Sequence, residues 1–238
     1  MLSLMRVTFL FLAGCVPMIA AQPNTLSAEE KAAGWVLLFD GVTPRGWLEV
    51  TGLPFPTTSW TVEDGCLKGF PNPDGIQDIR TVDTYRSFDL RFEWKILKGG
   101  NSGVKYLVQR TDRWQRKGEA GFQARARGLE YQIVDEENRD GADPKRKTGA
   151  LYSAMAPRGG VVKPFGEFNE SRILVRNDHV EHWLNGVRVL AFDLTQPEAL
   201  RVLRDNRRSD DIVRISPICL QNHGAPVWFR NLKIRRLD

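Results

Sequence analysis

Apolar and charged residues alternate without interruption over residues 88–96, whose sequence is FDLRFEWKI. Successive side chains of a β-strand point to opposite faces, so all the apolar residues share one face and all the charged residues share the other. The apolar positions are Phe88, Leu90, Phe92, Trp94 and Ile96. This pattern predicts an antiparallel strand with one face in the core and the other toward solvent.

Shorter segments rich in β-branched and aromatic residues follow the same period of two, and each is bounded by turn residues. Glu63-Asp64-Gly65, Asn177-Asp178 and Asn185-Gly186 supply the residue types that tight hairpin turns require. A Gly/Pro loop at 222–226 joins the last two segments. The strands expected on this basis span residues 60–62, 66–68, 104–109, 130–135, 172–176, 179–184, 187–192, 212–221 and 227–237.

Only two segments carry helix signals. Ser27 and Glu30 have the spacing of a capping box, and Gly34 stands where a helix would end, which together predict a short helix at 27–33. Helices are therefore a minor part of the expected fold.

The second helix is expected at 196–208, with Thr195 as its cap and Pro197 near its first turn. About a dozen short strands with two short helices predict an all-β sandwich or jelly roll of two antiparallel sheets. No repeat and no shift of composition marks a boundary, so we expect a single domain over residues 24–238.

The first 21 residues have the pattern of a secretory signal peptide. Arg6 is followed by an apolar run that is too short to span a membrane, and then by small residues ending in Ala20-Ala21. A second interpretation stays open, because Leu12-Ala13-Gly14-Cys15 matches a bacterial lipobox in which Cys15 is lipidated. Both interpretations predict an exported protein of the periplasm or cell envelope. Under the second, a lipid anchor at Cys15 is its one expected contact with a membrane.

Composition narrows the function classes. The chain has 238 residues, a net charge of +5 and 42% hydrophobic residues, which are ordinary values for a globular protein. Its basic residues are interleaved with acidic and apolar ones, so we expect no nucleic-acid partner. Beyond the N-terminal segment only Cys66 and Cys219 remain, either as one disulfide or as two separate buried thiols.

Several catalytic motifs are absent from the sequence. It contains none of the signatures of zinc proteases, common serine hydrolases or nucleotide-binding enzymes. His179 and His182 lie three apart on one expected strand, so they point to opposite faces and cannot share a metal. No motif assigns a cofactor, and a divalent metal stays open.

The segment 130–135, EYQIVD, holds the strongest candidate site residues. Tyr131 and Ile133 are expected in the core, so Glu130 and Gln132 project from the opposite face and Asp135 lies at the strand end. A glutamate beside a glutamine on the concave side of a sheet suits a bound sugar, whereas a solvated strand face is the alternative interpretation.

Two other segments add candidates. The glycine-rich run 99–103, GGNSG, opens a strand and lets its backbone approach a ligand or another strand closely. Lys105 alternates with an aromatic residue, so one of the two faces away from the core. His223 follows a strand end within a Gly/Pro loop, where sandwich folds commonly hold ligands.

A series of motifs follows one order across residues 33–237. These are GWVLLFDG at 34–41 with Gly46-Trp47, WTVEDG at 60–65, FDLRFEW at 88–94, GNSGVKY at 100–106, EYQI at 130–133, TGALY at 148–152, LQNHG at 220–224 and VWFRN at 227–231. Together they resemble the 3-keto-disaccharide hydrolase family. The resemblance implies a concanavalin-like jelly roll, an exported protein, and cleavage of glycosides whose sugar carries a ketone at C3.

The same resemblance implies roles for individual residues. Glu130 and His223 are the candidates for catalytic base and acid, and Lys105 for stabilising the developing oxyanion. The residues expected to contact the saccharide are Asn101, Gln132, Gln221, Asp135 and Trp114, whereas Trp47 is expected in the core. Many relatives carry a histidine in the loop that here reads DEENRDG at 135–141; Asn138 or Arg139 stands in its place, which leaves the activity and metal use of this member open.

A C3 ketone changes what the catalytic site must supply. It acidifies the hydrogen on C2, so the C1 substituent can leave by elimination and water can then add. Such a site needs a base, donors for the enolate oxygen and an acid, rather than the paired carboxylates of an ordinary glycosidase. Two alternatives stay open: a carbohydrate-binding module without catalysis, and a conventional glycoside hydrolase, which is disfavoured because Glu130 and Asp135 lie on opposite strand faces.

Overall fold

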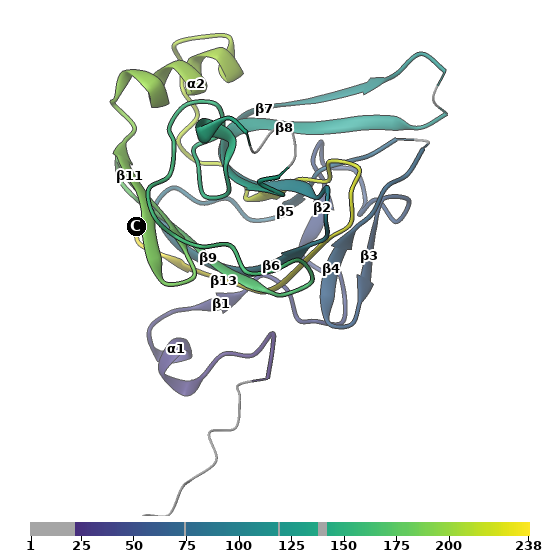
Figure 1. The fold of residues 1–238 in the computed structure, drawn as a ribbon, viewed down its shortest axis with the longest axis horizontal. Helices are drawn as coiled ribbons and strands as arrows, with labels where there is room; N and C mark the ends of the chain where they lie inside the picture. Colours follow the sequence, from purple (N-terminus) through teal and green to yellow (C-terminus); the bar gives the residue numbers. More distant parts are fainter. Residues whose placement is uncertain (1–21, 74, 119, 138–141) are drawn as a thin grey trace, which may run out of the picture.

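Two antiparallel β-sheets pack face to face, as the all-β jelly-roll prediction required (Figure 1). The computed structural model describes residues 22–73, 75–118, 120–137 and 142–238. The predicted signal segment 1–21, with Cys15, lies outside the described residues, so export and lipidation stay predictions. No helix in the described part of the chain has the length and apolar character needed to cross a membrane.

The larger sheet has the order β11-β10-β9-β6-β13-β4-β3, with β1 beside β13. All its pairs are antiparallel, and hairpins at the predicted turns join β3 to β4, β9 to β10 and β10 to β11. Its strands are β1 (Val36–Leu37), β3 (Trp60–Glu63), β4 (Cys66–Gly69), β6 (Phe88–Ile96), β9 (Asn169–Arg176), β10 (His179–Leu184), β11 (Val187–Asp193) and β13 (Val227–Arg236).

The smaller sheet has the order β2-β5-β12-β7-β8. Its strands are β2 (Trp47–Glu49), β5 (Ile79–Thr81), β7 (Asn101–Gln115), β8 (Phe122–Val134) and β12 (Cys219–Leu220). β12 is much shorter than the strand expected at 212–221. Pro217 has no N–H for a strand ladder, and Val213 bonds to the Gln109 side chain through both its N–H and its carbonyl, so 212–218 run as an irregular segment.

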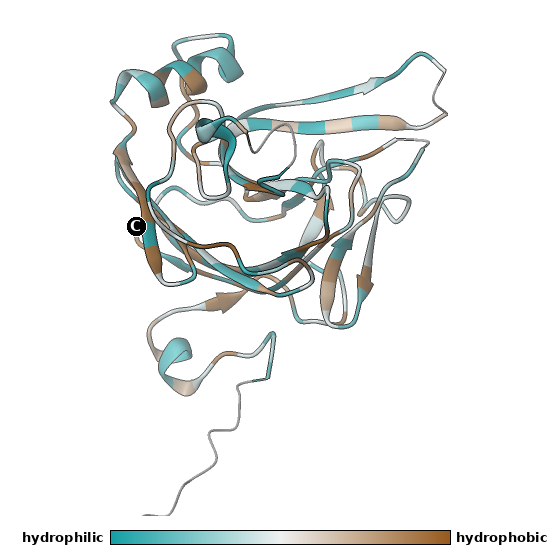
Figure 2. Ribbon diagram, viewed as in Figure 1, coloured by the Kyte–Doolittle hydropathy of each residue, from teal (hydrophilic) through white to brown (hydrophobic). Residues whose placement is uncertain are grey.

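The core lies between the two sheets. The apolar residues of β6, which alternate along the strand as predicted, are all buried, and aromatic rings from the smaller sheet pack against them. Trp94 donates its indole N–H to Ser171 Oγ at 2.8 Å, and the Tyr131 hydroxyl bonds the same oxygen at 2.8 Å. Hydrophobic residues recur along the strands of both sheets, whereas α2 is largely hydrophilic (Figure 2). Trp47 is buried, as expected.

Both predicted helices are present. α1 (Ala28–Ala32) has the capping box of Ser27 and Glu30. α2 (Pro197–Arg207) lies within the predicted range, but its cap is Gln196, which makes no side-chain capping bond; the assignment of Thr195 as cap was wrong because the helix begins one residue later. A short 3₁₀ turn, η1, spans Pro144–Arg146.

The two remaining cysteines are free thiols. Cys66 and Cys219 are both buried and make no disulfide, so the interpretation as separate apolar core residues is confirmed. Burial raises the pKa of the Cys66 thiol and of the Cys219 thiol, which keeps both protonated and unreactive at neutral pH.

β7 and β8 extend beyond the sandwich as a two-stranded arm, which we define as residues 110–118 and 120–127 (Figure 1). A bulge marks the point of departure, because Tyr106 pairs with Leu129 and Arg110 with Arg127, so that 107–109 lie opposite Gly128 alone. A Cβ on Gly128 would lie 2.8 Å from the Tyr106 carbonyl oxygen, so this position accepts only glycine without rearrangement. The bulge therefore redirects both strands toward one side of the sandwich.

His182, on β10, is a second buried polar residue of the core. Its side chain is fully enclosed, with Nδ1 2.9 Å from the Gly149 carbonyl oxygen and Nε2 2.8 Å from the Tyr106 hydroxyl. A carbonyl oxygen only accepts, so Nδ1 carries the proton and Nε2 accepts from Tyr106. Burial lowers the pKa of His182 to about 4, so the ring is neutral in the folded protein at neutral pH.

We expect His182 to make stability depend on pH between about 6.5 and about 4. In this window the unfolded histidine takes up a proton and the folded one does not, so the free energy of unfolding falls as the pH falls, by on the order of 3 kcal/mol. His182→Gln should be less stable at neutral pH but lose less on acidification. Urea unfolding of both proteins at neutral and acidic pH measures the difference, and equal losses in the two would contradict this prediction.

Candidate active site

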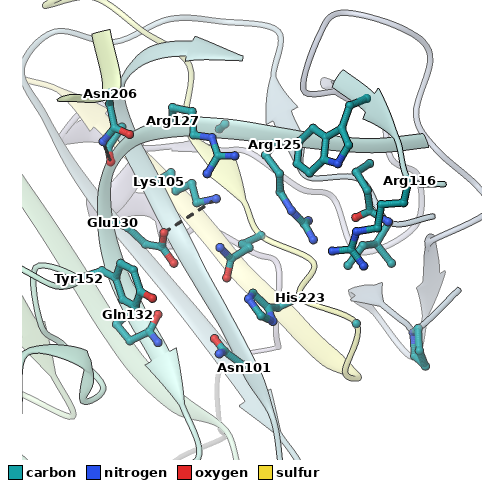
Figure 3. Close-up of a pocket in the computed structure, with 18 of the residues that line it drawn as sticks. Asn101, Lys105, Arg116, Arg125, Arg127, Glu130, Gln132, Tyr152, Asn206 and His223 are labelled. Carbon is teal, nitrogen blue, oxygen red and sulfur yellow. Dashed lines mark hydrogen bonds and ion pairs between the residues drawn. The ribbon is translucent and has the colours of Figure 1, made fainter. Parts of the chain in front are cut away.

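A cavity of about 940 Å³ lies on the outer face of the smaller sheet. Its floor is formed by β7 and β8, whose core-facing residues such as Tyr131 point the other way. Its walls come from the arm, from α2, from residues 71–73 with Ile76, and from the loop at 221–224. Seven of the eight residues predicted for the site line it: Asn101, Lys105, Trp114, Glu130, Gln132, Gln221 and His223 (Figure 3).

Asp135 is the one predicted site residue that does not line this cavity. It is buried at the end of β8, where its carboxylate accepts hydrogen bonds from the backbone N–H groups of Gly99 and Glu137 at 2.7 and 2.9 Å. These bonds hold the turn into β7 rather than a ligand. Asn138 and Arg139, considered as replacements for the histidine found in relatives, lie outside the described residues.

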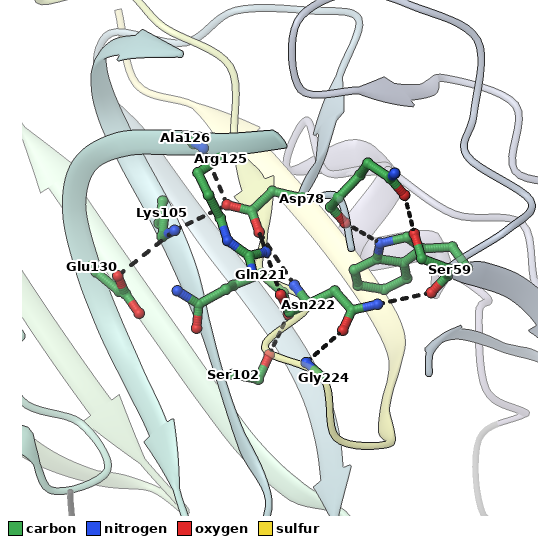
Figure 4. A network of polar contacts seen from close by, with 12 residues as sticks. Ser59, Asp78, Ser102, Lys105, Arg125, Ala126, Glu130, Gln221, Asn222 and Gly224 are labelled. Carbon is green, nitrogen blue, oxygen red and sulfur yellow. Dashed lines mark hydrogen bonds and ion pairs between the residues drawn. The ribbon is translucent and has the colours of Figure 1, made fainter. Parts of the chain in front are cut away.

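Asp78 anchors the site from beneath (Figure 4). Its side chain has no exposed surface and precedes β5. Oδ2 accepts from Lys105 Nζ at 2.9 Å and from the Ala126 N–H at 3.1 Å, while Oδ1 accepts from Arg125 Nη1 at 2.8 Å and the Asn222 N–H at 3.3 Å. One carboxylate thus joins β7, β8 and the loop after β12.

Asn222 extends this network to the loop that carries His223. Its amide donates to the carbonyl oxygens of Ser59 at 2.8 Å and Phe70 at 3.0 Å, and its Oδ1 accepts from the Gly224 N–H at 2.9 Å. Arg125 Nη1 also bonds the Asn222 carbonyl oxygen. His223 itself is exposed at the rim of the cavity, between Asn222 and Gly224, which these hydrogen bonds hold in place.

Glu130 is the carboxylate of the cavity. Its side chain is only 12% exposed, and Oε2 lies 3.9 Å from Lys105 Nζ, which is an ion pair without a direct hydrogen bond. Burial raises the pKa of the Glu130 carboxyl; the nearby Lys105 ammonium opposes this effect and the Asp78 carboxylate adds to it. Glu130 therefore holds a proton more readily than an ordinary glutamate, which suits a group that both accepts and returns a proton.

Gly103 makes room for this carboxyl group. It precedes Lys105 by two residues on β7, and a Cβ at this position would lie 2.5 Å from Glu130 Oε1. The glycine-rich entry to β7 thus allows the close approach that its sequence predicted, and the approaching group is the side chain of the neighbouring strand.

Two amide side chains beside Glu130 have unsatisfied polar atoms. Gln132 is 1% exposed, and neither its Nε2 nor its Oε1 has a hydrogen-bond partner; Gln221 is 7% exposed, and its Oε1 has none. Buried amides of folded proteins are almost always bonded, and leaving one unpaired costs roughly 1–3 kcal/mol. Both line the cavity, so a polar ligand there would supply the missing partners.

Sequence reasoning missed the charged partners of these residues. Asp78, Arg116, Arg125 and Arg127 were not among the candidates, and neither were Tyr152 and Asn206 at the rim. Strict alternation from Glu130 puts odd-numbered positions of β8 in the core, whereas Arg125 and Arg127 line the cavity because the strand changes face at Gly128. The spacing of Arg125 and Arg127, two residues apart, was the feature of the sequence that could have indicated a shared cationic face.

Metal ligands are not gathered in the described residues: no group of three His, Cys, Asp or Glu side chains there is close enough to hold an ion. The chemical groups assembled in the cavity are instead one carboxyl group, one buried ammonium, unpaired amides, a rim imidazole and several guanidinium groups.

Asp78→Asn should destabilise the protein strongly. The amide keeps the shape but removes the carboxylate that Lys105 and Arg125 share, and breaking a buried ion pair costs about 3–5 kcal/mol. Urea unfolding at neutral pH measures the loss. Asp83→Asn, at an exposed position five residues along the chain, is the matched control and should change little. Equal stability of Asp78→Asn and the unmodified protein would contradict the anchoring role.

Comparisons with known proteins agree with this architecture. The sequence model of a family described as a 3-keto-alpha-glucoside-1,2-lyase-like domain matches residues 34–235. A curated protein of Bacteroides thetaiotaomicron named 3-keto-disaccharide hydrolase is 31% identical over 244 aligned residues, covering 92% of this chain and 84% of that protein.

Solved structures also match this chain over most of its length. A crystal structure from Parabacteroides distasonis, described as a candidate glycosyl hydrolase, superposes with a TM-score of 0.72 at 32% identity and covers 91% of this chain and 100% of that one. A second from the same organism has a TM-score of 0.63 at 24% identity, covers 85% of this chain and 99% of its own, and supports the fold alone. As the order of its motifs predicted, the chain belongs to the 3-keto-alpha-glucoside-1,2-lyase-like family.

Proposed function

We propose that this protein cleaves glycosides whose sugar carries a ketone at C3, by elimination across C1 and C2 followed by addition of water. Family membership makes the chain an enzyme of the hydrolase type. The observation that carries the proposal is the composition of the cavity. Among its described lining residues Glu130 is the only carboxylate, and it lies beside a lysine and two buried amides with unsatisfied atoms.

A single carboxylate argues against ordinary glycosidase chemistry. That reaction uses two carboxyl groups facing the same glycosidic bond, about 5–9.5 Å apart. Asp78, the nearest other carboxylate in the site, is fully buried and accepts hydrogen bonds from Lys105, Arg125 and two backbone N–H groups. It therefore has no free face to offer a substrate, whereas proton abstraction beside a ketone needs only one base.

In the first step Glu130 removes the proton from C2 of the bound sugar. The C–H electron pair forms the C1–C2 double bond as the C1–O bond breaks, and negative charge builds on the C3 oxygen on the way. Lys105 Nζ has N–H groups beyond the one that Asp78 accepts, and the unpaired Gln132 amide lies on the same strand face as Glu130, so both can donate to this oxygen. His223, in its protonated form, gives a proton to the departing oxygen.

In the second step water adds across the double bond. Its oxygen attacks C1 while neutral His223 takes a water proton, and Glu130 returns its proton to C2. Both groups then have their starting protonation states, and the net reaction is hydrolysis of the glycosidic bond. The raised pKa of Glu130 serves both directions of transfer, because a catalytic group works best when its pKa approaches the working pH.

The purified protein should release product from a 3-keto-glucoside and not from the same glucoside without the ketone. Only the ketone acidifies C2–H enough for one carboxylate to act as base. Chromatographic detection of the free aglycone measures both reactions, and a parallel sample with a chelator measures any metal requirement. Cleavage of both substrates would indicate a conventional glycoside hydrolase, and binding without product from either would indicate a carbohydrate-binding module.

Glu130→Gln should lower kcat/KM on the 3-keto-glucoside by roughly 10²–10⁴-fold, the contribution of a general base. In the unmodified protein the acidic limb of the pH–rate profile should lie above the ordinary glutamate pKa of 4.5, because Glu130 must be ionised to accept the proton and burial raises its pKa. Steady-state rates of both proteins, measured from below pH 4.5 to neutral pH, give the loss of kcat/KM and the position of the acidic limb.

Two measurements separate loss of chemistry from loss of folding. A raised pKa means that ionisation of Glu130 disfavours the folded state, so Glu130→Gln should melt at the same or a higher temperature at neutral pH. Glu170→Gln, the same change at an exposed position of β9, should keep full activity. Normal turnover by Glu130→Gln would exclude Glu130 as the base.

A further inference from the structure

The arm end of the cavity is lined by guanidinium groups that the proposed reaction does not use. Arg116, Arg125 and Arg127 line the cavity from the arm, while Glu130, Gln132 and Tyr152 lie on its other side (Figure 3). The base Glu130 and the amide Gln132 thus lie at one end. The other end presents positive charge.

Strand pairing places these cations on one face of the arm. Arg125 lies opposite Asp112, Arg127 opposite Arg110, and Gln123 opposite Trp114, and residues paired in this way point to the same side of a two-stranded ribbon. Arg116 follows Trp114 by two residues and lines the cavity as well. This face therefore gathers four guanidinium groups beside one aromatic ring.

The carboxylates described near this face are shared between cations. Asp112 is shared between Arg110 and Arg127, and Asp78 is shared between Arg125 and Lys105. Each carboxylate thus serves two cations. Glu130 is the other acidic group among the described residues that line this cavity. In the described part of this region the four cations Arg110, Arg125, Arg127 and Lys105 therefore outnumber the three carboxylates Asp112, Asp78 and Glu130.

The guanidinium groups keep donors for a ligand. Asp78 and the Asn222 carbonyl both bond Nη1 of Arg125, and Asp112 bonds Nε of Arg127. A guanidinium has five N–H donors in a planar fork that matches the oxygens of a carboxylate or sulfate, so each arginine can hold its carboxylate and a ligand oxyanion together. Trp114, partly exposed beside Arg127, offers an apolar surface next to these donors.

We infer that this cavity selects substrates whose leaving group carries a negatively charged oxyanion, a carboxylate or a sulfate, bound by Arg116, Arg125 and Arg127. This inference rests on the proposed function, which places the keto sugar at Glu130 and so leaves the arm end to the departing group. The ring of that group lies against Trp114, and its anionic substituent pairs with the arginines.

The test uses 3-keto-glucosides that share one aryl leaving group and differ only in its para substituent, which is carboxylate, sulfonate or the uncharged carboxamide. The measured quantity is the ratio of kcat/KM for each anionic substrate to that for the carboxamide. We expect a ratio of at least about tenfold in the unmodified protein, as for one charge-assisted hydrogen bond, falling as NaCl is raised. The carboxylate and sulfonate arms show which oxyanion the site prefers.

Arg116→Gln and Arg127→Gln should each bring this ratio toward one. Comparing the ratio between proteins cancels the intrinsic difference between the leaving groups. Arg116 is exposed at the end of its strand, so its variant tests the charge even where Arg127→Gln alters the arm. Arg176→Gln removes the same charge from an exposed position of β9, outside the cavity, and should keep the ratio of the unmodified protein.

The outcomes separate this inference from the proposed function. Turnover of all three keto substrates with ratios near one, or ratios that the two arginine variants leave unchanged, would overturn the anion site and leave the proposed reaction standing. Absence of turnover on every keto substrate would overturn the proposed reaction. Calorimetry with the unoxidised carboxylate and carboxamide glucosides then decides the anion site, and equal or undetectable affinity for both would overturn it.

Discussion

The buried carboxylate of Asp78 is the interaction on which the site depends. It lies where three separate segments meet: β7, β8 and the loop after β12. Burying this carboxylate without partners would cost a large free energy of desolvation. Its hydrogen-bond partners offset that cost and hold the carboxylate in one position. Because it holds Lys105 and Arg125, which both line the cavity, one buried anion fixes the positions of both cations.

A second constraint is the bulge where the arm leaves the sandwich. Close backbone approach at Gly128 and the left-handed conformation of Leu107, at φ 45°, are strained features that a regular hairpin would not contain. Because of these features, opposite faces of β8 line the cavity before and after Gly128. Within the sandwich the lining residues are the even-numbered Glu130 and Gln132, and on the arm they are the odd-numbered Arg125 and Arg127. A single strand thereby presents acid–base and cationic groups in succession.

The sequence was sufficient for features that depend on local periodicity and composition. Alternation identified the β6 core face, and capping residues identified α1, because neighbours along the chain determine both. It failed where distant contacts decide the outcome: Gln109 holds the 212–218 segment out of the sheet, and the face change at Gly128 conceals Arg125 from any strict period of two. Asp78 was missed for the same reason, since all its side-chain partners are at least 27 residues away.

Burial has opposite consequences at the two carboxylates of this region, and their difference explains why the chemistry falls to Glu130. Asp78 is surrounded by donors, so its lone pairs are occupied and it is a structural counter-ion. Glu130 is nearly as enclosed, but its closest cation stands 3.9 Å away and is already bonded to Asp78. Burial therefore raises the pKa of Glu130, and the Lys105 ammonium only partly offsets this effect. Because Lys105 bonds Asp78 directly and Glu130 only at 3.9 Å, Asp78 is a structural anion and Glu130 is left able to exchange a proton.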